Sequence, residues 1–220
     1  MIYERERNEV CEYAVRMWRA GLVVGSAGNV SVRAPDAGRF VITPSSIAYD
    51  RLTPEQVVVV DAEAELLELD DEEFDRAPSF ETPVHLAVYA ARSDVGAIVH
   101  THSAHASAFA LARRSIPPVV DEMVVYLGGG VPLAAYGASG SDSLAANVVS
   151  ALGARSAVLL TAHGVLTSGK DLAKAFKNAE LVEHVARVVT LAEQMGASVP
   201  ELPAEVLDAE RQMYEIVKAM

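Results

Sequence analysis

The chain has 220 residues, of which 51% are hydrophobic and 22% charged, so it is predicted to fold as a single globular domain over residues 1–220. Its formal net charge of −12 argues against nucleic acid or an anionic membrane surface as the main partner. A phosphorylated small molecule is not excluded, because backbone N–H groups can bind an anion locally.

The first half of the chain is predicted to contain one helix and several short strands. The segment 4–20 has helical spacing, with Val10, Ala14, Met17 and Trp18 on one face and Gly21 as a stop. The elements expected next are strands at 30–33 and 40–42 with a turn at 34–38 between them, a hairpin formed by 57–61 and 66–69, and a solvated acidic loop at 70–75.

In the second half, helices and strands are predicted to alternate. Ser79 is expected to cap a helix that runs to about Arg92. The later predicted elements are a buried strand at 97–102, a helix at 103–113, a strand at 131–136, a helix at 141–152, a last strand at 157–161, and helices at 171–195 and 204–218. This order predicts an α/β fold in which helices cover a mixed sheet.

The sequence is typical of a protein from a reducing compartment. Its single cysteine, Cys11, cannot form a disulfide framework within one chain. No apolar run approaches the roughly 18 residues of a membrane span. The charged segment 1–7 lacks the apolar run of a secretion signal. We therefore expect a cytoplasmic protein.

Three histidines stand at the ends of apolar runs of strand length. His100 and His102 follow the run 95–99, and residues two apart on a strand project from the same face, so both imidazoles point to one place. His163 ends a second run, 157–162, and a third imidazole from a neighbouring strand would complete a facial set of nitrogen ligands. With one open position, that set suits a catalytic Zn2+. Taken alone, the His100–His102 pair is equally compatible with core histidines bonded to the backbone.

Glu81 lies at the start of the helix after Ser79, where the helix dipole favours a carboxylate. A carboxylate beside a three-histidine zinc can be a fourth ligand, or can be displaced and act as a base. His85 lies one turn further on the same helix face. It either supports the site or has a plain structural role.

Segments of small residues predict a phosphate site. The loop 25–29 contains two glycines and exposes backbone N–H groups, and 43–46 offers hydroxyls after a strand. Ser79 offers another hydroxyl at a helix N-terminus, where anions bind well. Each segment alone is weak, because turns are rich in these residues for backbone reasons.

An acidic pair, Asp121 and Glu122, follows the apolar segment 116–120. Two carboxylates at such a place suggest either a proton-transfer group with a perturbed pKa or an interface ion pair.

Together these residues resemble the class II aldolase/adducin family, and most closely its L-fuculose-phosphate aldolase branch. The similarity rests on four stretches, which are 26–33, 42–45, 100–105 and 163–164. Glu81, His85, Tyr89 and Arg92 also reproduce the spacing of the family's glutamate helix. The match runs in order from about Glu4 to Met195.

The resemblance implies an α/β fold with a central, mainly antiparallel sheet flanked by helices, and a cyclic homotetramer with active sites between subunits. It implies retro-aldol cleavage of a ketose 1-phosphate to dihydroxyacetone phosphate and an aldehyde. It implies Zn2+ on His100, His102 and His163, with Glu81 as fourth ligand or acid/base. It also implies a substrate-phosphate site formed by Asn29, Ser45 and Ser79, with Ser26, Gly28 and Ser46 nearby.

Two departures from the branch bear on the reaction. Where the branch carries a catalytic tyrosine, this chain has Asp121 or Glu122. An aspartate in this region is similar to the sister L-ribulose-phosphate 4-epimerase, and a glutamate to the methylthioribulose-phosphate dehydratase, so both reactions are alternatives. Phe80 stands in place of a second phosphate-binding serine, and Ser46 in place of a glycine. A non-catalytic, adducin-head-like interaction domain is the alternative from another class, but such relatives lack the metal histidines.

Overall fold

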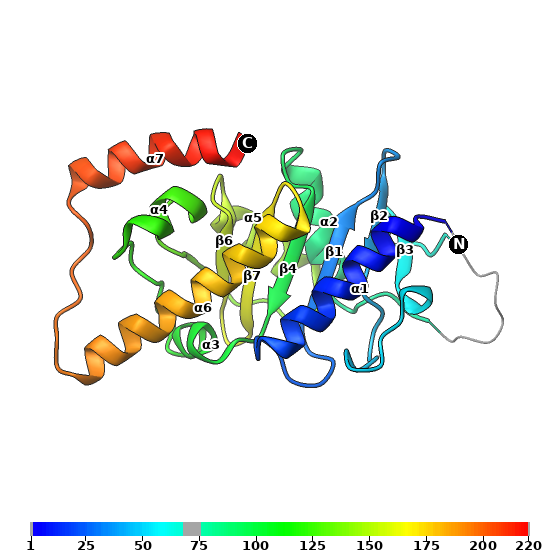
Figure 1. The fold of residues 1–220 in the computed structure, drawn as a ribbon, viewed down its shortest axis with the longest axis horizontal. Helices are drawn as coiled ribbons and strands as arrows, with labels where there is room; N and C mark the ends of the chain where they lie inside the picture. The colour runs from blue at the N-terminus through cyan, green and yellow to red at the C-terminus, as the bar shows by residue number, and fades with distance from the viewer. Residues whose placement is uncertain (1, 68–75, 220) are drawn as a thin grey trace.

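The computed structural model describes residues 2–67 and 76–219, and its centre is a sheet of seven strands in the order β3-β2-β1-β4-β7-β6-β5 (Figure 1). Every strand pair is antiparallel except β5 with β6, so the predicted mainly antiparallel sheet is confirmed. The strands are β1 (Asn29–Arg33), β2 (Arg39–Ile42), β3 (Val58–Asp61), β4 (Ala97–Thr101), β5 (Leu133–Ala134), β6 (Ala157–Leu160) and β7 (Gly164–Gly169).

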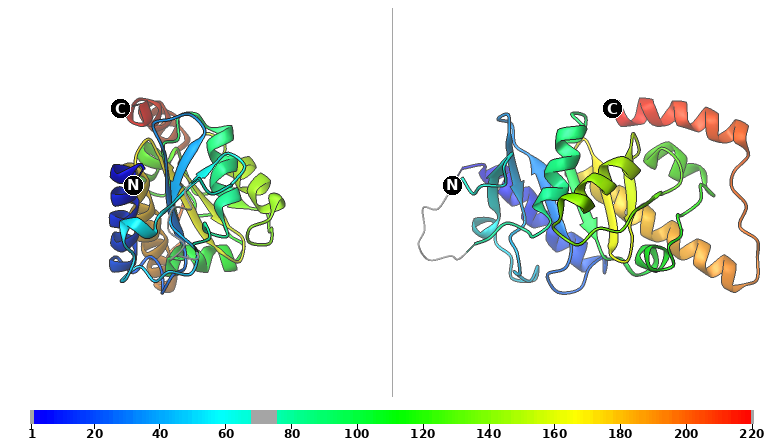
Figure 2. Two further views of the ribbon diagram at one scale, coloured as in Figure 1. Left: turned by 90° about the vertical axis from the view of Figure 1, so that its right-hand side faces the viewer. Right: turned by 180° about the vertical axis from the view of Figure 1, so that it is seen from behind.

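Helices cover both faces of the sheet, as the edge-on view of Figure 2 shows. The helices α1 and α6 lie on one face, and α2 and α5 lie on the other. The bounds are α1 (Glu4–Arg19), the 3-10 turn η1 (Pro54–Gln56), α2 (Thr82–Ala91), α3 (Ala104–Leu111), α4 (Asp121–Leu127), α5 (Asp142–Leu152), α6 (Leu172–Gln194) and α7 (Ala204–Ala219). The fold is therefore the predicted α/β class.

Alternation along the strands separates the two faces. Val30 and Val32 of β1 pack in the core under α1 and α6, whereas Ile98 of β4 packs in the core under α2 and α5. Because successive side chains of a strand point to opposite faces, Asn29 and Ser31 lie on the α2 face. That face is where the candidate site forms.

The first helix differs from its prediction at one residue. Val10, Ala14 and Met17 are fully buried as expected, but Trp18 is 38% exposed. With about 100° per residue, Trp18 lies roughly 80° around the helix from Val10, at the margin of the apolar stripe. Trp18 was predicted on the same face as the other three, and it lies at the exposed margin of that face.

Several predicted boundaries were also wrong. Ser79 is not the cap of α2, because Glu81 occupies the N-cap position and the helix begins at Thr82. The strand expected at 131–136 is reduced to β5, and 157–161 is not the last strand, because β7 follows it. The expected hairpin and acidic loop extend over residues 68–75, which lie outside the described residues. Among the described residues, the hairpin is reduced to a single bridge between Val60 and Leu66.

Among the helices at 2–67 and 76–219, none combines the length and the apolar character that crossing a bilayer would require.

Candidate functional site

Four predicted ligands meet at the end of β4. One potential ligand atom from each of Glu81, His100, His102 and His163 lies within 4.8 Å of all the others. The two carboxylate oxygens of Glu81 lie 3.0 Å from Nε2 of His100 and 3.0 Å from Nε2 of His163. Nε2 of His100 also lies 3.0 Å from Nε2 of His102. The structure thus brings together all four residues of the predicted metal set.

The three imidazole rings are arranged almost symmetrically. Each pair of ring centroids is 4.9 Å apart, with interplanar angles of 73°, 73° and 75°. Nδ1 of His100 lies 3.0 Å from the carbonyl oxygen of Val165, so an N–H there leaves the lone pair on Nε2, which faces the cluster. The donor set and the ring arrangement therefore fit a divalent metal ion.

His163 reaches the cluster from a turn and not from a strand. It follows β6 and directly precedes β7, and Ala162 before it has a positive φ of 58°. The strand beside β4 is β7, where Val165 is paired with Thr101. The expectation that a neighbouring strand would carry the third histidine was therefore inexact, because β6 is separated from β4 by β7.

Gly164 permits this close approach. A Cβ atom built on it would lie 2.3 Å from the carbonyl oxygen of Thr101 and 3.0 Å from Cδ2 of His102. Any larger residue would separate the turn from the end of β4, and the three rings would lose their common focus.

The carboxylate and the imidazoles perturb one another. Burial would raise the pKa of Glu81, but His100 and His163 outweigh it and hold that pKa well below its usual value. Burial would lower the pKa of His100, but the adjacent Glu81 outweighs it and raises that pKa. Burial lowers the pKa of His102 to about 4, with help from His100 and His163. The carboxylate thus favours the charged form of His100, and burial favours the neutral form of His102.

A pocket of about 220 Å³ opens onto the cluster. Among the described residues that line it there is no lysine or arginine, so an anion there would meet N–H groups, hydroxyls and the metal site. Its lining contains all six predicted phosphate-site residues together with three members of the cluster, namely Ser26, Gly28, Asn29, Ser45, Ser46, Ser79, Glu81, His102 and His163.

The Asn29 side chain is also bound within the protein. Its Nδ2 donates to Oε2 of Glu81 at 2.9 Å, and its Oδ1 lies 2.6 Å from Nε2 of His85. Asn29 therefore supports Glu81 directly, a role that sequence reasoning did not assign to it.

Ser139 is a site residue that sequence reasoning missed. Its hydroxyl donates to Oε1 of Glu81 at 2.9 Å from the loop between β5 and α5. The neighbouring Gly140 lies under the ring of Phe80, because a Cβ there would be 2.5 Å from Cε1 of that ring. A serine in a polar loop gives no sequence signal that distinguishes it from an ordinary turn residue.

Ser46 adopts a left-handed conformation with φ of 63°. Such a conformation costs a non-glycine residue about 1–2 kcal/mol, which explains why a glycine suits this position in the resembling branch. Ser46 keeps the turn, and its hydroxyl lies 3.3 Å from that of Ser45.

Asp121 and Glu122 do not reach the cluster within this chain. Both are exposed in the first turn of α4, and neither lines the pocket. Tyr214 of α7 is also occupied elsewhere, because its hydroxyl donates to the carbonyl oxygen of Ala154 at 2.8 Å and lies 2.9 Å from Oγ of Ser156.

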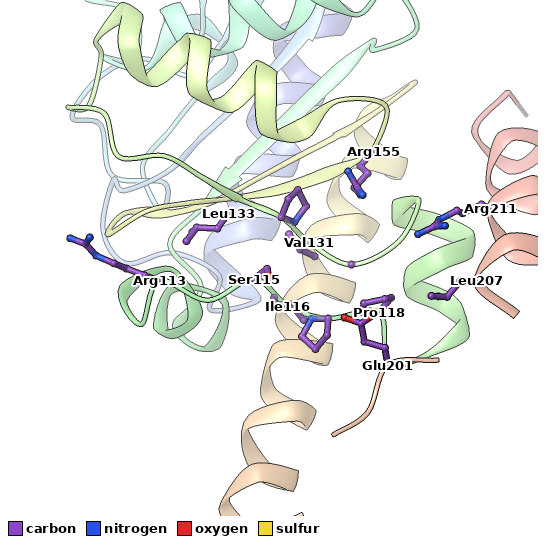
Figure 3. Close-up of a pocket in the computed structure, with 13 residues that line it drawn as sticks. Arg113, Ser115, Ile116, Pro118, Val131, Leu133, Arg155, Glu201, Leu207 and Arg211 are labelled. Carbon is purple, nitrogen blue, oxygen red and sulfur yellow. The ribbon is translucent and has the colours of Figure 1, made fainter. Parts of the chain in front are cut away.

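A larger pocket, of about 520 Å³, lies away from the cluster between the β5 edge, α4 and α7 (Figure 3). Arg113, Arg155, Arg211 and Glu201 are among the residues that line it. None of the predicted site residues does so. The predicted metal and phosphate residues thus lie around the smaller pocket.

The chain is similar to known proteins over nearly its whole length. Residues 8–190 match the family described as the class II aldolase and adducin N-terminal domain. The chain is 32% identical over 196 residues to the 5-deoxy-D-ribulose 1-phosphate aldolase of Bacillus thuringiensis, with 89% of each protein covered. It is 34% identical over 204 residues to the L-fuculose phosphate aldolase of Escherichia coli K12, with 91% of each covered. A solved L-fuculose 1-phosphate aldolase matches with a TM-score of 0.89 and 31% identity, covering 98% of each chain.

Gly164→Ala should disturb the cluster through its new methyl group. We expect the free energy of unfolding, measured by urea denaturation, to fall by about 1–3 kcal/mol, because β7 must move away from β4. Affinity for a divalent metal should fall with it. Gly196→Ala is the control for metal affinity, because its Cβ lies in open space far from the cluster, although its φ of +77° adds a backbone strain of its own. A Gly164→Ala protein with wild-type stability and metal affinity would contradict the close approach.

Proposed function

The chain belongs to the class II aldolase and adducin family, and on that premise we propose that it is a zinc-dependent aldolase that cleaves a ketose 1-phosphate to dihydroxyacetone phosphate and an aldehyde. It is a class II aldolase and therefore a lyase. The observation that carries the finer proposal is the convergence of one carboxylate and three imidazoles at the base of a pocket. A non-catalytic interaction domain would not account for that cluster.

Zinc is proposed because of the donor set. Histidine nitrogen and carboxylate oxygen bind Zn2+ at about 2.0–2.2 Å, and catalytic sites leave one position open for a substrate or water. His100, His102 and His163 would hold the ion, and Glu81 would be its fourth ligand or the adjacent acid/base. When bound, the ion would supply Lewis acidity to oxygen atoms of the substrate.

Glu81 is the proposed proton carrier at the reacting carbon. It is 7% exposed and lines the pocket. Retro-aldol cleavage breaks the C3–C4 bond of the ketose, and Glu81, after taking up a proton from solvent, would deliver it to the carbon of the enediolate that is left and return to the carboxylate form. Asp121 or Glu122 would take the proton that the C4 hydroxyl loses as the aldehyde departs.

The substrate phosphate is proposed to bind at the serine-rich side of the pocket. The backbone N–H groups near Gly28 and the hydroxyls of Ser26, Ser45 and Ser79 are suited to phosphate oxygens. Phe80 is 70% exposed at this pocket and offers an apolar ring where the resembling branch has a hydroxyl. The names of the relatives, which include fuculose phosphate and 5-deoxyribulose 1-phosphate, support a phosphorylated ketose as substrate.

A cytoplasmic homotetramer with active sites between subunits is part of the proposal. Since Asp121 and Glu122 do not line the pocket of their own chain, they would act in the pocket of a neighbouring subunit. Both side chains are exposed on α4, where Asp121 lies beside Glu210 of α7.

Zinc binding should be stoichiometric and should weaken in acid. We expect roughly one zinc per chain by elemental analysis, as for a single three-histidine site. Zn2+ requires the neutral form of His100, and Glu81 raises the pKa of that imidazole. Affinity should therefore fall by up to about tenfold per pH unit as pH drops through the raised pKa, in a chelator competition assay. His163→Ala should lose the metal, while His184→Ala, an exposed residue of α6, should keep it. Zinc-free protein after zinc loading would refute the metal site.

Turnover should release dihydroxyacetone phosphate. In a coupled assay, added glycerol-3-phosphate dehydrogenase reduces the released dihydroxyacetone phosphate and consumes NADH. We expect the wild type to give this loss of NADH with at least one ketose 1-phosphate of a panel. Glu81→Gln should lower kcat by about 10²–10⁴-fold, because proton transfer by a positioned carboxylate typically contributes that much. Glu193→Gln, on the outer part of α6, should not change it. Formation of an epimer, or loss of water without triose phosphate release, would establish one of the rival reactions instead.

Mixed assemblies should reveal whether the acidic pair acts across subunits. The Glu81→Gln chain and the Asp121→Ala/Glu122→Ala chain should each be nearly inactive alone. When the two are co-expressed with different tags, about a quarter of the sites in a cyclic assembly would combine an intact Glu81 with an intact neighbouring pair. Partial recovery of kcat is therefore expected. If the acidic double variant alone keeps full kcat, the pair has no part in the reaction.

A further inference from the structure

A line of buried polar side chains runs from Glu81 into the protein between β1 and α2. Tyr89 OH lies 2.8 Å from Oγ of Ser31, and that Oγ lies 2.6 Å from Nδ1 of His85. Nε2 of His85 lies 2.6 Å from Oδ1 of Asn29, whose Nδ2 donates to Glu81 at 2.9 Å. Tyr89, Ser31, His85 and Asn29 are each at most 3% exposed, so water does not compete for these bonds.

Each hydrogen bond in this line has only one consistent direction. A carboxylate accepts, so Asn29 must present its N–H to Glu81 and its carbonyl oxygen to His85. His85 must then carry its proton on Nε2, which leaves a lone pair on Nδ1 for the hydroxyl of Ser31 to donate to. Tyr89 in turn donates to Ser31. Burial, followed by the nearby His100, lowers the pKa of His85 to about 3, in agreement with a neutral ring.

The direction of these hydrogen bonds matters because the side-chain amide of an asparagine can rotate by 180°. Rotated by 180°, Asn29 would place its carbonyl oxygen against Oε2 of Glu81, and two acceptors would face each other in a dry interior. His85 excludes that state, because its Nε2–H needs an oxygen opposite it. The carboxylate thus sets the direction of the row, and the Nε2–H of His85, with the Ser31 hydroxyl on the other ring nitrogen, keeps the amide N–H turned toward Glu81.

We propose that His85 is a positioning residue, whose Nε2–H, with Ser31 against its other ring nitrogen, holds the Asn29 amide in this orientation and thereby fixes Glu81 for proton transfer. The effect on turnover rests on the proposed aldolase function. The tautomer itself does not, so it can be tested even if the aldolase proposal fails.

The tautomer can be read by long-range ¹H–¹⁵N NMR of the histidine rings, with the His85 signals assigned by their loss in His85→Gln. We expect one neutral tautomer protonated at Nε2 in the wild type and in Ser31→Ala, because the Asn29 carbonyl oxygen accepts from that nitrogen in both. A ring that is charged, or protonated at Nδ1, in the wild type would overturn the proposal. So would a Ser31→Ala protein whose ring is protonated at Nδ1.

Kinetics then separate positioning from a merely structural role. Removal of groups that orient the residues of a metal site typically costs about 10–100-fold, so we expect His85→Phe to lower kcat by that factor and to leave KM within about threefold. His85→Gln keeps an N–H toward Asn29 and should recover most of kcat. Tyr13→Phe, on the opposite face of the sheet, keeps its ring against Phe176, at 5.6 Å between centroids, and should change kcat little.

Ser31→Ala, which removes one small hydroxyl, should lower kcat less than His85→Phe does. It replaces His85→Phe in this test if the His85→Phe protein does not fold. Wild-type kcat in both would overturn the proposal, as would a loss confined to KM, or His85→Gln being as impaired as His85→Phe. If the wild type itself releases no triose phosphate from any ketose 1-phosphate, the proposed function fails, and the tautomer result stands alone.

Discussion

The alignment of α2 with β1 is the constraint on which the site depends. Two residues along a strand advance about 6.6–6.8 Å, and four residues along a helix advance about 6 Å. Residues spaced by two on β1 can therefore stay opposite residues spaced by four on α2. Asn29 meets Glu81 and His85, and Ser31 meets His85 and Tyr89. A polar row thus runs between β1 and α2, and every member of it has a partner.

The metal cluster adds a second requirement at the end of that row. His100 is paired with Asn29 across β4 and β1, so the carboxylate of Glu81 lies between the helix and the strand end. His163 must then come within reach from the turn before β7, which Gly164 permits. The cluster therefore needs both the strand pairing and the helix register to be correct.

Much of this arrangement could be predicted from local patterns. The strand period of two placed His100 and His102 together, and the helix period placed Glu81 in line with His85. The origin of His163 in a turn could not be found, because β7 has glycines at both ends and a weak apolar pattern. Ser139 and the polarity of the Asn29 amide depend on contacts between segments far apart in sequence, which no local pattern reports. The short helix α4 was missed because seven residues carry little periodicity.

Both rims of the sheet are closed to further strands. β5 offers only two residues at one rim. At the other, the backbone of Glu65 and Leu67 already bonds to β3 through Asp61 and Val59. Exposed rims with free N–H and C=O groups invite pairing between molecules, and short or covered rims prevent it. Among the described residues, these rims therefore disfavour edge-to-edge pairing between copies of this chain.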